Sequence, residues 1–72
     1  MSDIAIPAEV VAKIRIQLGA RAKDLCLHER NNELVLQGTV PSYYVKQLAQ
    51  HLALDLLGTI PFVNEIQVVP RL

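Results

Sequence analysis

The segment LVLQGTVPSYYVKQLAQHLALDLLG, residues 34–58, holds the clearest pattern in this chain of 72 residues. Its first seven residues alternate in hydrophobicity, which is typical of a half-buried strand. One side of that strand carries four residues: Leu34, Leu36, Gly38 and Val40. A glycine on the apolar side indicates either the close approach of a packed helix or a β-bulge, and we favour the close approach.

After Pro41 the apolar residues recur at the three- and four-residue intervals of an α-helix. Ser42 is a good N-cap and Gly58 marks the C-terminal end, so a helix of about four turns lies between them. We expect its inward face to carry five residues: Val45, Leu48, Ala49, Leu52 and Leu56.

The segment before residue 34 predicts a helix, a strand and a tight turn. Pro7 and Glu9 favour a helix start and Gly19 a helix end. Its apolar stripe consists of Val10, Val11, Ile14 and Leu18, with Ile16 off the stripe. The segment DLCLHER, residues 24–30, then alternates like a strand.

Asn31 and Asn32 follow, and asparagine tolerates the positive φ of a two-residue hairpin turn. At the other end of the chain, FVNEIQVV, residues 62–69, predicts a final strand. The order helix, strand, strand, helix, strand predicts the α+β class: a three-stranded mixed sheet with both helices packed on one face. We predict a single domain over residues 1–72, with its core in residues 8–69.

Composition limits the function more than it identifies it. The chain is 51% hydrophobic but only 4% aromatic, so the core is aliphatic. Seven basic residues balance seven acidic ones, which leaves no overall field to attract nucleic acid. The single cysteine, Cys26, cannot close an internal disulfide. No G-x-x-G clamp or phosphate-binding glycine motif is present, so we predict no RNA or nucleotide binding.

The second half of the chain resembles the BON domain family. That family's pattern is an apolar strand ending in L-x-G-x-V, a helix rich in Ala and Leu, then Gly-Val and a V-x-N strand. The matching residues here are Leu36, Gly38, Val40, Gly58, Ile60, Val63, Asn64, Ile66 and Val68. Asn32 stands where the family usually has glycine, and it can adopt the same left-handed conformation.

The resemblance covers residues 8–69 and implies a bacterial, envelope-associated module that binds phospholipid or mediates envelope interactions. This chain departs from the family in having one copy of the domain, no visible export signal and no attached module. We therefore expect a cytoplasmic location, or a periplasmic one if a signal peptide was removed.

Candidate chemistry is sparse. Cys26 and His28 share one face of a strand, and His51 would be a third ligand of a zinc site. We favour a structural interpretation, with a small buried thiol and a half-exposed imidazole. Asn64 is expected to be buried, with its amide bonded to backbone groups at the preceding turn. We predict no catalytic residue, metal or cofactor.

Two surfaces remain as candidate binding sites. The first is a basic stretch of four residues, which is either a lipid headgroup site or solvated charge that compensates a helix dipole: Lys13, Arg15, Arg21 and Lys23. We favour the second of these interpretations. The other surface is the outward face of the second helix: Tyr43, Gln47, Gln50, Leu54 and Leu57.

These patterns favour a non-enzymatic module that forms a homodimer, or docks to another protein, through the outward face of its second helix. The alternative is weak binding to an anionic phospholipid surface through the basic stretch.

Overall fold

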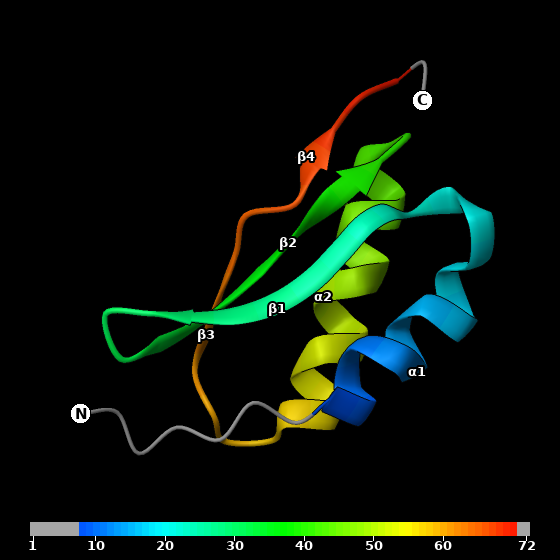
Figure 1. The fold of residues 1–72 in the computed structure, drawn as a ribbon. Helices are drawn as coiled ribbons and strands as arrows, with labels where there is room; N and C mark the ends of the chain where they lie inside the picture. Colours follow the sequence, from blue (N-terminus) through cyan, green and yellow to red (C-terminus); the bar gives the residue numbers. More distant parts are fainter. Residues whose placement is uncertain (1–7, 71–72) are drawn as a thin grey trace.

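The computed structural model describes residues 8–70. Its helices and strands follow one another in the predicted order (Figure 1): α1 (Ala8–Leu18), a 3-10 turn (Gly19–Arg21), β1 (Lys23–Arg30), β2 (Glu33–Val40), α2 (Tyr43–Leu57), β3 (Phe62–Asn64) and β4 (Gln67–Val68). β1 pairs antiparallel with β2, while β3 and β4 both pair with β2 in parallel. The α+β class and the mixed sheet are confirmed.

Both helices pack on the same face of the sheet and share one aliphatic core with it. α1 contributes Val10, Ile14 and Leu18, as its stripe predicts. The strands contribute four leucines and Val40, and the segment between β3 and β4 contributes Ile66. Ile16, off the stripe, is 78% exposed. In the part of the chain that the structure describes, no helix has the length and hydrophobicity needed to cross a bilayer.

Local signals set the turn and the helix ends. Arg30 pairs with Glu33, and both residues between them have positive φ, 54° for Asn31 and 66° for Asn32. The two-residue hairpin is therefore confirmed. Ser42 caps α2, its Oγ accepting a hydrogen bond from the Val45 N–H at 3.3 Å.

α2 ends at Gly58, whose φ of 64° suits glycine and whose N–H donates to the Leu54 carbonyl at 3.0 Å. The predicted final strand is divided into β3 and β4. The Asn64 Oδ1 accepts a hydrogen bond from the Ile66 N–H at 3.0 Å, which makes a local turn at the break.

The explanation expected for Gly38 is wrong. Opposite Gly38, β1 has two residues, Asp24 and Leu25, because the β1–β2 register shifts between Lys23 and Cys26. This two-against-one arrangement is a β-bulge, the alternative that the sequence left open. Asp24 adopts φ 54°, a conformation that aspartate tolerates better than most residues.

The bulge pushes the backbone of β1 against Gly38. A Cβ placed on Gly38 would lie 3.2 Å from the Leu25 Cα and 3.3 Å from the Lys23 carbonyl oxygen. These contacts are with the neighbouring strand and not with a helix. Gly38 is thus required by the close approach of two strands.

The buried face of α2 is also rotated from the expected one. Its fully or nearly fully buried residues are Val45, Ala49, Ala53 and Leu57. Leu57 is only 5% exposed, so its expected position at the edge of the outward face is wrong. The two alanines are 0% exposed and let α2 come close to the sheet, which turns the bulkier Leu48, Leu52 and Leu56 toward its flank.

Candidate functional site

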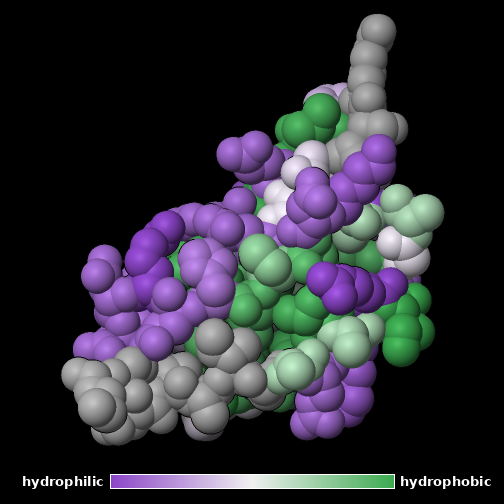
Figure 2. Space-filling model, in the orientation of Figure 1, coloured by the Kyte–Doolittle hydropathy of each residue, from purple (hydrophilic) through white to green (hydrophobic). Residues whose placement is uncertain are grey.

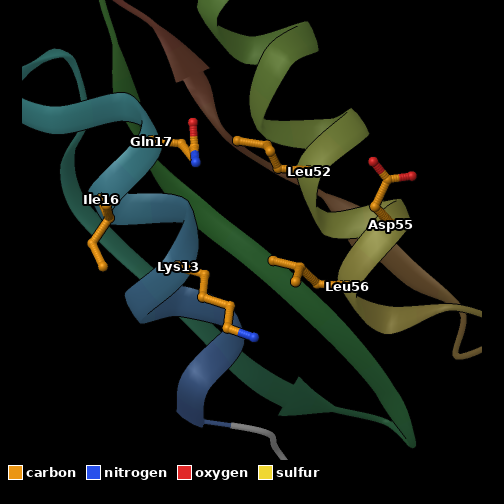
Figure 3. A pocket seen from close by; sticks show the side chains of 6 residues that line it. All are labelled: Lys13, Ile16, Gln17, Leu52, Asp55 and Leu56. Atoms are coloured by element: carbon orange, nitrogen blue, oxygen red, sulfur yellow. The ribbon is translucent and has the colours of Figure 1, made fainter.

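A groove runs between α1 and α2 on the side of the helices that faces away from the sheet. It has a volume of about 310 Å³ and six lining residues: Lys13, Ile16, Gln17, Leu52, Asp55 and Leu56. Figure 3 shows Leu52 and Leu56 pointing from α2 toward α1, with Lys13 and Gln17 pointing back across the groove. The groove therefore has an aliphatic floor between two polar margins.

Ile16 and two opposite charges stand at the margins of this groove. Ile16, on α1, is the most exposed of the large hydrophobic side chains in the described residues, at 78%. Lys13 belongs to α1 and Asp55 to α2, and both are exposed. Within residues 8–70 neither of them takes part in a salt bridge. The surface thus combines accessible aliphatic area with a positive and a negative group on opposite sides.

The interface residues predicted on α2 do not form one surface. Tyr43 is 65% exposed and Leu54 is 47% exposed. Gln47 is half-buried, and Leu57 belongs to the core. The Gln50 Oε1 accepts a hydrogen bond from the Asn64 Nδ2 at 3.1 Å, so this amide is used within the chain.

The basic stretch is likewise divided among different sites. Lys13 lies at the groove margin, whereas the Arg15 Nη2 donates to the Leu25 carbonyl of β1 at 2.7 Å. Arg21 donates from Nε to the Leu18 carbonyl at 3.0 Å and from Nη2 to the Gln17 carbonyl at 3.2 Å. Arg21 thereby compensates the C-terminal end of α1, the structural role favoured for this stretch.

The potential metal ligands do not converge. Cys26 and His28 alternate with the core residues of β1, so they lie on the open face of the sheet, the face that the helices do not cover. His51 belongs to α2, on the opposite side. Cys26 is exposed, which corrects the expected buried thiol.

Asn64 has a structural role, but not the predicted one. It is half-buried, and its partners are Gln50 and the following Ile66 N–H instead of groups at the preceding turn. It therefore joins α2 to the break between β3 and β4.

A polar network on the open face ties β1 and β2 to the segment between β3 and β4. Arg30 of β1 forms a salt bridge with Glu65, and the Gln37 Nε2 of β2 donates to the Glu65 Oε1 at 3.1 Å. The hydrogen bond from Arg30, then that from Gln37, lowers the pKa of the Glu65 carboxyl below its usual range. A hollow of about 380 Å³ beside this network has both polar and apolar lining. The side chains of the network bond one another and so serve the fold.

Side chains also cover backbone groups at the two edges of the sheet. At the β1 edge, Arg15 bonds the Leu25 carbonyl. At the other edge, Glu65 and Val69 donate their N–H groups toward β2, so the Ile66 N–H between them points outward, where Asn64 bonds it. These side-chain hydrogen bonds to edge backbone groups hinder edge-to-edge pairing of strands. In Figure 2 hydrophobic side chains show in the centre of the face where α1 meets β1, with hydrophilic ones toward the β1–β2 turn on the left.

Sequence reasoning missed the groove because it treated the two helices separately. The available signal was Ile16, an isoleucine on the outward side of a helix whose stripe lies elsewhere. Asp55 could be recognised as part of the site only once the antiparallel packing of α1 and α2 was known.

Comparisons with known protein families, with curated proteins and with solved structures found no match to this chain. The functional argument therefore rests on the geometry described above.

Proposed function

We propose that this chain is a non-enzymatic, BON-like interaction module that self-associates through its helical layer, the surface of α1 and α2 facing away from the sheet. The observation that carries the proposal is the 78% exposure of Ile16 at the margin of a groove floored by Leu52 and Leu56. An exposed aliphatic side chain next to an aliphatic groove is a surface that gains free energy when a partner covers it.

The other surfaces are less suited to association. The open face of the sheet carries the network of Arg30, Gln37 and Glu65, whose polar groups bond one another. Both sheet edges have backbone groups occupied by side chains. Three further large hydrophobic side chains are exposed on α2 outside the groove: Tyr43, Tyr44 and Leu54.

The expected affinity is modest. Full burial of an aliphatic side chain contributes about 1.5 to 3 kcal/mol, and a symmetric contact uses each side chain twice. Association costs at least about 4 kcal/mol in lost translational and rotational freedom. A dimer with a dissociation constant in the micromolar range is consistent with this small aliphatic surface.

The test is sedimentation equilibrium over a wide concentration range, and we expect the wild type to pass from monomer to dimer. Ile16→Glu should remain monomeric with unchanged far-UV circular dichroism, because Ile16 makes no part of the core. Gln67→Glu is the matched control, since it adds the same charge to an exposed residue of β4 and should leave the dimer intact. A wild type that stays monomeric at high micromolar concentration would refute self-association.

A weak association with anionic phospholipid through the basic residues is the alternative function. Two of these residues, Arg15 and Arg21, bond backbone carbonyls, so the geometry favours the protein interface. The compartment in which the module acts stays a prediction from the sequence.

A further inference from the structure

We infer that the second copy docks in one defined orientation, with Lys13 of each copy facing Asp55 of the other across the helix groove. The inference rests on the proposed self-association and specifies the residues that select the partner. It assigns Lys13 and Asp55 as determinants of specificity and the groove as the contact site.

The antiparallel packing of the helices defines levels along the groove. Figure 3 shows Gln17 at the level of Leu52 and Lys13 near that of Leu56, and it shows Asp55, one residue before Leu56, on the side of α2 away from α1. Lys13 and Asp55 therefore stand at similar levels but on opposite sides of the groove.

A two-fold axis running along the groove turns the second copy over and exchanges its two sides without changing levels along the axis. α1 of one copy then lies on α2 of the other. Because levels are kept and sides are exchanged, Lys13 meets Asp55 of the second copy, and the symmetry repeats this contact. The same rotation places the exposed Ile16 over the outer side of α2 in the other copy.

The charges distinguish this orientation from its main competitor. A two-fold axis perpendicular to the groove, at the level of these residues, would place α1 on α1 and α2 on α2. Lys13 would then face Lys13 and Asp55 would face Asp55, so like charges would meet twice. Opposite charges on the two margins thus favour one orientation and disfavour the other, which is how charged rims confer specificity.

Neither charge is committed to another partner. Both side chains are exposed, and within the described residues neither forms a salt bridge. The aliphatic floor supplies the contact area, and the two charges set its orientation.

Charge exchange between the two positions tests this inference. Lys13→Glu alone places two carboxylates against each other at both contacts, and Asp55→Lys alone places two ammonium groups together. Each variant should dimerise about tenfold or more weakly than the wild type, since facing like charges oppose association. Both positions are exposed, so circular dichroism should show an intact fold.

The decisive measurement mixes the two variants. In the mixture, the glutamate that replaces Lys13 in one variant would face the lysine that replaces Asp55 in the other, and the native Lys13 and Asp55 would complete the second contact. We expect a heterodimer of Lys13→Glu with Asp55→Lys, detected by native mass spectrometry with one variant labelled with ¹⁵N. The double variant Lys13→Glu/Asp55→Lys should also recover a homodimer.

The outcomes separate this inference from the proposed function. A monomeric wild type overturns both. A wild-type dimer that Ile16→Glu dissociates, but whose charge variants neither weaken alone nor recover together, overturns the orientation and leaves the helical interface standing. Recovery both in the mixture and in the double variant establishes the contact between Lys13 and Asp55.

Discussion

Gly38 lies where the neighbouring strand β1 leaves no room for a side chain. The bulge at Asp24 and Leu25 brings the β1 backbone against β2, and a Cβ on Gly38 would lie 3.2 Å from the Leu25 Cα. Relief requires a shift of the backbone and not only of a flexible side chain. Any side chain at this position therefore disturbs strand pairing near the Arg15 contact with Leu25.

We predict that Gly38→Ala lowers the free energy of unfolding by about 1 to 3 kcal/mol, the usual range for overpacking. Urea denaturation monitored by circular dichroism measures the change. Gln67→Ala, at an exposed residue beside the same hollow, should change stability by less than about 0.5 kcal/mol. Equal stability of Gly38→Ala and wild type would show that the strands can separate without cost.

The sequence predicted that Gly38 has a structural role, but the reason favoured for that role, the close approach of a helix, was wrong. Asparagines at 31 and 32 have a local signal, because a two-residue turn requires positive φ at both positions. The bulge depends instead on how residues 24–25 align with Gly38, which is a contact between segments that are distant in the sequence. Asp24, a single aspartate with φ 54°, gives no sequence signal comparable to that of the two asparagines.

At the scale of elements, the helix and strand positions follow from periodicity and capping. Which residues of α2 face the core does not follow from them, because periodicity identifies a broad apolar stripe but does not show which residues lie at its centre. Leucines at 48, 52 and 56 suggested one centre, whereas the fully buried Ala49 and Ala53 mark the actual contact with the core. Small side chains at that contact let α2 lie closer to the sheet than leucines would. The distance between α2 and the sheet therefore determines how α2 is rotated about its own axis.

The polar network of Glu65 links elements that backbone pairing alone connects weakly at the break between β3 and β4. Arg30 and Gln37 bond a carboxylate that lies between these two short strands. The pKa of Glu65 is lowered from its ordinary value of 4.5 mainly by the hydrogen bond from Arg30. The folded chain therefore binds a proton at Glu65 less readily than the unfolded chain does.

This sign gives a pH-dependent prediction. The contribution of Glu65 to stability is fully present above the unfolded pKa near 4.5 and is lost as the pH falls through the lower folded pKa. Wild type should exceed Glu65→Gln in melting temperature at neutral pH, and the difference should shrink as the pH falls toward about 3. Added salt should also reduce it, because the pair is exposed to solvent.

Thermal melts over this pH range, with Glu9→Gln on α1 as a control outside the network, measure the effect. A difference between wild type and Glu65→Gln that is unchanged from neutral to acid pH would contradict the role of the ionised carboxylate.

At the scale of the whole molecule, the fold separates polar from apolar surface. The helices form an aliphatic groove on the side that faces away from the sheet. The open face of the sheet carries a polar network, and Arg15 and Asn64 bond backbone groups at its two edges. The sequence predicted an interaction surface on the helical side, but α2 alone was expected to form it. The contribution of α1 emerges only from the packing of the two helices.

The same distribution of side chains predicts weak binding to membranes. Seven basic residues are balanced by seven acidic ones, so no net charge draws the chain to an anionic surface. Arg15 and Arg21 are held by backbone carbonyls, and Lys13 lies at the groove margin. These three residues are therefore divided among different contacts and do not form one cluster.

We accordingly expect little retention of the protein on phosphatidylglycerol vesicles in co-sedimentation at low salt, and none at physiological salt, where screening removes exposed charge interactions. Phosphatidylcholine vesicles control for nonspecific trapping. The informative variant is Lys13→Gln/Lys23→Gln, because it removes two charges without breaking the arginine bonds that support α1 and β1. Strong low-salt retention that this variant abolishes would contradict the prediction and establish lipid binding. Retention unaffected by the variant would also count against the prediction, and would point to insertion of apolar side chains such as Ile16 instead of charge.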